Sequence, residues 1–208
     1  HYAGSTVCGP SRCSLLTGLH TGNAYLRGNG SVALPPDPAS PTIGSYLQKE
    51  GYVTAMIGKS GVACNSNDAS LPNKKGFDHF YGYLAHLAAH HHFPRTLWKN
   101  GEKVTFKGNH EKYGDTYSDD VAIQDSVRFI EKNKGKPFFL HIALTAPHAD
   151  LTAPKESIAP FLNKMGKERA YPDGHYAGVK QPKAAFAGMV THMDRSLGSV
   201  FAKLKELK

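Results

Sequence analysis

The sequence places a cysteine and an arginine together at the expected start of a helix. In Cys8-Gly9-Pro10-Ser11-Arg12, the proline suits a first helical turn, because its missing N–H would have no partner there. Cys8 would then lie at the N-terminal end, where free backbone N–H groups and the helix dipole favour a bound oxyanion. Arg12, about one turn further on, adds a cationic side chain that can donate two hydrogen bonds to one anion. The stretch therefore predicts a site for a sulfate or phosphate group.

A lysine ends the next apolar run, residues 51–59 (GYVTAMIGK). We expect Lys59 at the end of a strand, where open α/β sheets bind their ligands and a lysine offers a point charge to an anion. The triplet Gly58-Lys59-Ser60 also resembles the end of a nucleotide-binding P-loop. That alternative fails on spacing, because Val53 stands where the first glycine of such a loop would be.

Histidines supply candidates for acid–base chemistry. His90 lies in the histidine-rich segment 89–94 (AHHHFP), and an ordinary histidine pKa of about 6.5 suits protonation of a leaving alkoxide or phenoxide. His86 precedes His90 with helical spacing, so the two would share one helix face and could instead hold a transition metal. Leu87 disfavours that alternative, because a metalloprotease helix carries glutamate at this place.

A nearly continuous apolar run, residues 137–144, predicts a buried parallel strand that leads into a site loop. His148 follows this run and is a second histidine that could contact a substrate. His141 lies inside the run, and we expect it to be a core or edge histidine.

Other segments predict the scaffold that positions these residues. Thr42 can cap a helix that ends at Gly51, and Ser118 can start another. A long helix is predicted for residues 182–208 by apolar side chains at three-and-four spacing. Strands that alternate with helices indicate an α/β fold with a mostly parallel central sheet flanked by helices.

Two connections also have recognisable signals. Asn100-Gly101, between apolar segments, predicts the turn of a hairpin. Residues 171–181, which include two glycines and a proline, predict a mobile loop.

Composition narrows the class of protein. The 208 residues are 40% hydrophobic, with no apolar run long enough to span a membrane, and indicate one globular domain. The formal net charge of +8 fits a polyanionic partner, but the scattered lysines and arginines form no basic stripe for nucleic acid. Of the three cysteines, Cys8 and Cys13 lie too close for a useful disulfide, and a cysteine near a helix cap can simply be a small buried hydrophobe.

The first stretch resembles the signature of the sulfatase family in Cys8, Pro10, Ser11, Arg12, Leu16, Thr17 and Gly18. The resemblance implies that a separate formylglycine-generating enzyme oxidises Cys8 to formylglycine. The hydrated aldehyde would be the nucleophile and also a ligand for a divalent cation, usually calcium. Arg12 would steady the modified residue.

Further residues match the family pattern. Lys59 belongs to the second signature, and His90 and His148 align with the two substrate-binding histidines. One departure is clear, because many relatives read Lys-X-His where this chain has Lys59-Ser60-Gly61. The histidine that often assists the formylglycine hydrate is therefore missing at that position.

The resemblance covers roughly the whole chain and corresponds to the amino-terminal half of a sulfatase. It implies an alkaline-phosphatase-like core, in which residues 1–208 are part of a single catalytic domain without its first strand region and its carboxy-terminal part. The family's Asp-Asp pair would precede His1 and its Asp-Asn pair would follow Lys208, which leaves Cys8 as the candidate metal ligand. We therefore expect this piece alone to bind calcium poorly and to turn over slowly or not at all.

For the complete protein the resemblance implies an arylsulfatase-like sulfuric ester hydrolase, secreted or periplasmic, with sulfated polysaccharide as one candidate substrate. Catalysis would depend on Cys8, Arg12, Lys59 and His90, and substrate binding on Lys59, His90 and His148. Two alternatives stay open. One is a phosphoesterase or phosphonate hydrolase of the same superfamily, and the other is a non-catalytic, degenerate sulfatase that binds glycans.

Overall fold

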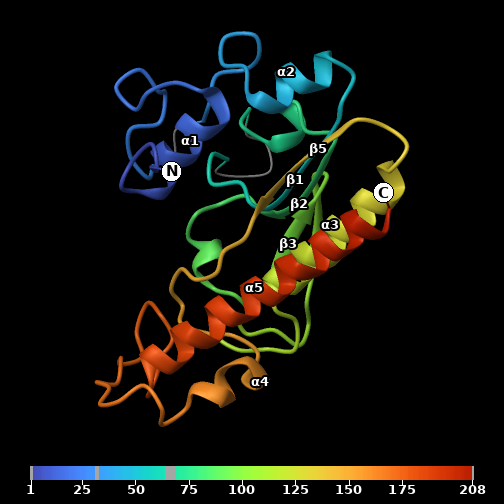
Figure 1. Ribbon diagram of the computed structural model, residues 1–208. Helices are drawn as coiled ribbons and strands as arrows, with labels where there is room; N and C mark the ends of the chain where they lie inside the picture. The colour runs from blue at the N-terminus through green and yellow to red at the C-terminus, as the bar shows by residue number, and fades with distance from the viewer. Residues whose placement is uncertain (1, 31–32, 64–68, 208) are drawn as a thin grey trace.

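The computed structural model describes residues 2–30, 33–63 and 69–207 and has a five-stranded sheet at its centre (Figure 1). The strand order is β4-β3-β2-β1-β5. Strand β1 pairs in parallel with both β2 and β5, whereas β3 and β4 add an antiparallel hairpin at one edge. The strands are β1 (Val53–Lys59), β2 (His79–Tyr83), β3 (Thr96–Lys99), β4 (Glu102–Thr105) and β5 (Phe138–Ala143). The predicted α/β fold is thus confirmed.

Helices cover both faces of the sheet (Figure 1). The α-helices are α1 (Cys8–Thr17), α2 (Ile43–Lys49), α3 (Ser118–Asn133), α4 (Lys155–Ile158) and α5 (Pro182–Glu206). Three short 3₁₀ helices are η1 (Pro72–Lys74), η2 (Ala88–His90) and η3 (Ala159–Phe161). In the described part of the chain, no helix is both long and apolar enough to cross a membrane.

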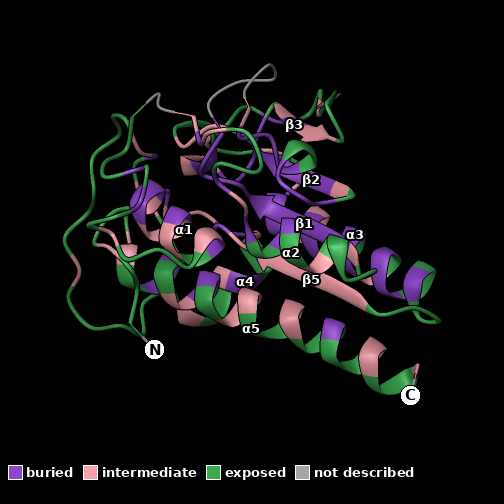
Figure 2. Cartoon of the chain, turned by 90° about the horizontal axis from the view of Figure 1, so that it is seen from above, coloured by how far each residue is buried: buried purple, intermediate pink, exposed green. Residues whose placement is uncertain are grey.

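The central strand β1 is buried on both of its faces (Figure 2). Met56 points into a core that includes Cys13 and Leu16 of α1, whereas Ala55 and Ile57 pack with side chains of α3. A parallel strand covered on both faces needs an apolar sequence rather than an alternating one, as residues 51–59 show. The outward side of α5 remains exposed (Figure 2).

Local signals define the ends of the helices and the hairpin turn. The Thr42 side chain accepts a hydrogen bond from the Ser45 backbone N–H and caps α2, as its sequence position predicts. Asn100 and Gly101 have φ angles of 49° and 89°, the left-handed geometry of a tight hairpin turn between β3 and β4. The helices predicted from Ser118 and Pro182 begin at those residues.

The parallel register places the connections that follow β1, β2 and β5 at the same end of the sheet, where the carboxyl ends of these strands lie. Lys59 at the end of β1 pairs with Tyr83 at the end of β2, and Gly58 pairs with Ala143 at the end of β5. The segments that carry His90 and His148 follow β2 and β5 directly. Because carboxyl ends of parallel strands meet at the same edge, this topology gathers the candidate residues.

Candidate active site

Cys8 is the first residue of α1 and has a free thiol. The N-cap residue, Val7, makes no side-chain hydrogen bond to the helix, and the Gly9 N–H donates instead to Oδ1 of Asn29 at 2.8 Å. Cys8 is half-buried and lines an open cavity of about 330 Å³ together with Arg12 and, unexpectedly, His141. The thiol therefore lies at the start of a helix and is accessible from this cavity.

Arg12 joins this helix to the end of β1. Its Nη1 donates a hydrogen bond to the backbone carbonyl of Lys59 at 2.7 Å. The Lys59 side chain is only 3% exposed, and its burial lowers its pKa; nearby Cys8 opposes that shift, while the charge of Arg12 adds to it. Burial also lowers the pKa of Arg12, again opposed by Cys8. Two cationic side chains and the thiol thus share one partly desolvated site.

His86 lies against Gly61 and Arg12. Gly61 has a φ of 67°, and a Cβ there would lie 2.4 Å from Cδ of Arg12 and 3.4 Å from Cε1 of His86. Burial, with smaller contributions from the charges of Lys59 and Arg12, lowers the pKa of His86 to about 4. Its Nδ1 atom is buried and has no hydrogen-bond partner among the described residues. His86 is therefore a neutral histidine beside the two cations.

The structure does not support the alternative of a helical metal pair at His86 and His90, which Leu87 already disfavours in the sequence. The helical segment is the short η2, which begins at Ala88, so the two histidines do not share a helix face. Across residues 2–30, 33–63 and 69–207, no group of three or more His, Cys, Asp or Glu side chains could hold a metal ion. Cys8 stays the ligand predicted for the expected calcium site in this part of the chain.

His90 and His148 come from different connections and lie face to face. Their ring centroids are 4.9 Å apart with an interplanar angle of 14°. Burial lowers the pKa of His90 to about 4, and the charge of Lys59 is the next cause. The two histidines aligned by sequence are therefore brought together, within the electrostatic reach of the β1 lysine.

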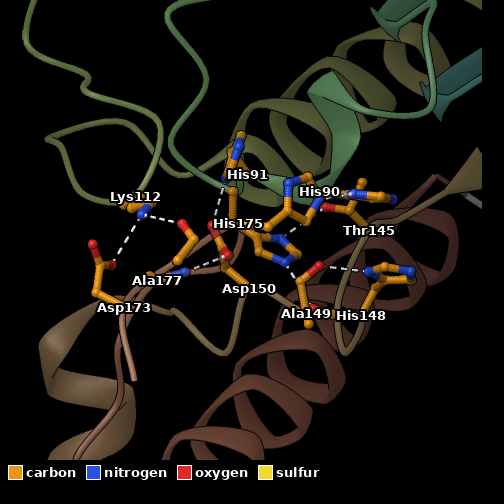
Figure 3. A network of polar contacts seen from close by, with 12 residues as sticks. His90, His91, Lys112, Thr145, His148, Ala149, Asp150, Asp173, His175 and Ala177 are labelled. Atoms are coloured by element: carbon orange, nitrogen blue, oxygen red, sulfur yellow. Dashed lines mark hydrogen bonds and ion pairs between the residues drawn. The ribbon is translucent and has the colours of Figure 1, made fainter. Parts of the chain in front are cut away.

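The third histidine of this group comes from the segment predicted as a mobile loop. His175 places Nε2 3.2 Å from Nδ1 of His90, and the two rings meet edge to face (Figure 3). Tyr176 follows, with its ring centroid 5.6 Å from that of His90. Neither residue is recognisable from sequence, because nothing in residues 171–181 indicates which tertiary partner they meet.

Residues 171–181 are anchored at several points. Tyr171 and Val179 form an antiparallel bridge, and Nζ of Lys112 donates to Oδ1 of Asp173 at 2.9 Å (Figure 3). Lys112 Nζ also donates to the Gly174 carbonyl oxygen at 2.7 Å. The segment predicted as a mobile loop thus has no helix or strand and makes several tertiary contacts, and its mobility stays a prediction.

Asp150 is a fully buried carboxylate at the centre of this network. It accepts a hydrogen bond from the Ala177 N–H at 2.8 Å and pairs with Nδ1 of His91 at 2.7 Å. Its own backbone N–H donates to the His90 carbonyl oxygen at 2.7 Å. Asp150, in the connection that follows β5, thus links the His90 segment to the His175 segment (Figure 3).

The turn that carries His148 has its own support. Asp119, near the start of α3, accepts hydrogen bonds from the backbone N–H groups of Thr145 and Ala146, both at 3.0 Å. His92 is fully buried, with Nδ1 3.0 Å from Oγ1 of Thr145 and Nε2 2.9 Å from the His148 carbonyl oxygen. His92 therefore stabilises the turn and does not face the site.

Comparisons with known proteins agree with this architecture. A family model described as Sulfatase matches residues 1–208. An extracellular sulfatase Sulf-1 homologue of Caenorhabditis elegans is 28% identical over 190 residues, covering 87% of this chain and 25% of that protein. An N-acetylglucosamine-6-O-sulfatase of Bacteroides thetaiotaomicron is 26% identical over 178 residues, covering 85% of this chain and 28% of that protein.

Solved structures show the same relationship. Ps i-CgsB in complex with k-i-k-neocarrahexaose superposes with a TM-score of 0.74 at 28% identity, covering 99% of this chain and 46% of that one. BT4656 in complex with D-glucosamine-2-N,6-O-disulfate has a TM-score of 0.63 at 26% identity, covering 83% of this chain and 30% of that one. The chain thus spans between a quarter and about half of the length of these relatives.

Proposed function

Because the chain belongs to the sulfatase family, we propose that the protein hydrolyses sulfate esters at the site formed by Cys8, Arg12, Lys59, His90 and His148. The observation that best supports this proposal is the 2.7 Å hydrogen bond from Arg12 Nη1 to the Lys59 carbonyl oxygen. It joins the helix that starts at Cys8 to the strand that ends at Lys59. We also propose that residues 1–208 are part of one catalytic domain.

Arg12 and Lys59 bind the sulfate group in this proposal. A guanidinium and an ammonium group beside a helix N-terminus provide charge-assisted donors for the oxygens of an oxyanion. Both side chains are largely desolvated, which strengthens their attraction for an anion that displaces water. The same donors stabilise the charge that develops on those oxygens in the transition state.

Cys8 is the precursor of formylglycine in this proposal, made by a formylglycine-generating enzyme. The surroundings fit that modification, since the thiol is unpaired, half-buried and lines an open cavity beside Arg12. His86 lies with Cε1 against the position of Gly61, and its buried Nδ1 has no hydrogen-bond partner among the described residues. Once formed, the hydrated aldehyde supplies the nucleophilic oxygen. A divalent cation such as calcium belongs to the same proposal, with Cys8 as its ligand in this part of the chain.

His90 and His148 contact the ester oxygen and the sulfate. With its pKa lowered to about 4, His90 is neutral near pH 7 and offers one N–H and one acceptor nitrogen. Such a ring can donate a hydrogen bond to the oxygen of the departing alcohol as negative charge accumulates there. The stacked His148 ring limits how far His90 can rotate.

A sulfated carbohydrate is the substrate class that we propose. BT4656 was solved with a disulfated glucosamine, and the Bacteroides relative is an N-acetylglucosamine-6-O-sulfatase. The formal net charge of +8 suits a polyanionic glycan. We also propose a periplasmic or secreted location, which is supported by the description of the Caenorhabditis relative as extracellular.

The test uses the full protein co-expressed with a formylglycine-generating enzyme. We expect sulfate release from an aryl sulfate and from sulfated oligosaccharides, and much slower release of phosphate from the matching aryl phosphate. Cys8→Ala should abolish turnover while leaving the circular dichroism spectrum and the melting temperature unchanged. Faster phosphate release would support the phosphoesterase alternative, and glycan binding without any turnover would support the non-catalytic one.

A further inference from the structure

His90 has one ring nitrogen engaged by another histidine. Its Nδ1 lies 3.2 Å from Nε2 of His175, with the rings at 88° to each other (Figure 3). Among the described residues, no side chain or backbone group is hydrogen-bonded to Nε2 of His90. His90 can therefore reach a substrate through Nε2 alone.

The hydrogen bond between the two histidines decides what Nε2 can do. A neutral imidazole carries its proton on one nitrogen, so one ring of such a pair donates and the other accepts. If His90 donated through Nδ1, its Nε2 would be a lone pair that could only accept. If His175 donates, His90 keeps its proton on Nε2 and can donate to an ester oxygen.

We propose that His175 is a positioning residue that donates through Nε2–H to Nδ1 of His90 and thereby holds His90 in the tautomer that donates from Nε2. This inference rests on the proposed function, in which His90 contacts the oxygen of the departing alcohol. It resembles the way in which outer hydrogen bonds select the tautomer of functional histidines in other sites.

Hydrogen bonds of Asp150 hold both of the segments that form the contact between His90 and His175. Asp150 accepts from the Ala177 N–H, two residues after His175, and donates its own N–H to the carbonyl oxygen of His90. The pair between Asp150 and His91 holds the residue that follows His90. A single buried carboxylate-bearing residue thus sets the distance between the two segments that present His90 and His175.

Neighbouring rings restrict the orientation of His90 further. His148 stacks on it with a centroid distance of 4.9 Å, and Tyr176 lies at 5.6 Å. His90 is consequently contacted on a face and on an edge, and rotation about its Cβ–Cγ bond would break the contact with His175. The exposed side chain of His175 makes its removal compatible with an intact core.

The first experiment measures the tautomer directly, without reference to activity. Nitrogen NMR of the full protein labelled in histidine should show His90 protonated at Nε2 near neutral pH. In His175→Phe, which keeps an aromatic ring but no N–H donor, His90 should become a mixture of both tautomers. His175→Gln retains an amide donor and should restore part of the Nε2–H population. Protonation of His90 at Nδ1 in the unmodified protein, or no change in His175→Phe, would overturn the proposal.

The second experiment asks whether the tautomer matters for the departing alcohol. With the formylglycine-bearing protein, His175→Phe should lower kcat for an alkyl or sugar sulfate by about tenfold to a hundredfold, in the range seen for outer hydrogen-bond partners. The decrease should be much smaller for an aryl sulfate, whose phenoxide needs less assistance. An equal decrease for both substrates would overturn the assignment. Lys180→Ala, an exposed substitution in the same segment, is the control for general disturbance.

The two experiments separate the two proposals. If the unmodified protein releases no sulfate, the proposed function fails, and NMR still decides whether His175 sets the His90 tautomer. If the protein is active but the tautomer does not respond to His175, the positioning proposal fails and the proposed function stands.

Discussion

A Cβ atom on Gly61 would lie 3.4 Å from Cε1 of His86. The position at which the family pattern has a histidine is thus flanked by a histidine from the segment that follows β2. Cδ of Arg12 would lie 2.4 Å from the same point, so a side chain at position 61 would clash with Arg12 in this conformation. The missing side chain at Gly61 is thus what allows Arg12 and His86 to pack at this position.

Burial of His86 predicts a pH dependence of stability. Its pKa is about 4 in the folded chain and about 6.5 when unfolded, so the unfolded chain binds more protons between these values. The free energy of unfolding should therefore fall as the pH is lowered from about 6.5 to about 4. Urea unfolding at a series of pH values should show a shallower slope for His86→Gln. Leu87→Ala, at an exposed neighbour, controls for disturbance of the segment, and an unchanged slope in His86→Gln would contradict the prediction.

Arg12→Lys tests the two-pronged donor at the site. Lysine keeps the positive charge but cannot reproduce the guanidinium geometry that bonds the Lys59 carbonyl and a sulfate oxygen together. We expect kcat/KM for sulfate release to fall by about a hundredfold, the size of losing one oxyanion donor. Arg27→Lys, at an exposed arginine, should leave kcat/KM unchanged. Equal kcat/KM values for Arg12→Lys and the unmodified protein would show that Arg12 does not bind the sulfate group.

Gly58→Ala should destabilise the sheet at the strand that leads to Lys59. Gly58 has a φ of 114°, and a Cβ there would lie 2.1 Å from the backbone oxygen of Ala143. We expect a loss of at least about 2 kcal/mol in the free energy of unfolding, from strain and a displaced strand pair. The matched control is Gly198→Ala in α5, where a Cβ meets nothing within 4 Å and should stabilise the helix by roughly 0.5–1 kcal/mol. Equal melting temperatures for the two variants would contradict this account.

Thr42→Ala should weaken the junction between α2 and the segment before β2. The Thr42 hydroxyl accepts from the Ser45 N–H and donates to the Lys75 carbonyl oxygen at 2.6 Å, in a buried position. Its loss should cost about 1–2 kcal/mol in chemical denaturation. Thr42→Ser retains the hydroxyl and should lose much less; a similar cost for both variants would point to the methyl group instead.

Much of the scaffold is encoded locally and could be predicted from the sequence. The cap at Thr42, the helix starts at Ser118 and Pro182 and the turn at Asn100-Gly101 depend on neighbouring residues, and the structure has each of them. Strand β1 was predictable because an apolar run covered on both faces is typical of parallel strands. Strand β5 forms as predicted but is only half-buried over most of its length, because it is the last strand in the sheet order. The spacing of His86 and His90 does not put them on one helix face, because helical spacing has meaning only where a helix forms.

By itself, the sequence identified the candidate site residues at the start of α1, at the end of β1 and in the segments that follow β2 and β5. The tertiary structure alone decided that His175 meets His90, that Asp150 holds both segments, and that His86 lies beside Gly61. The physical reason is that caps, turns and strand periodicity arise from interactions between near neighbours. Contacts between distant segments depend instead on sheet register and on the packing of buried polar groups, which no short stretch of sequence specifies.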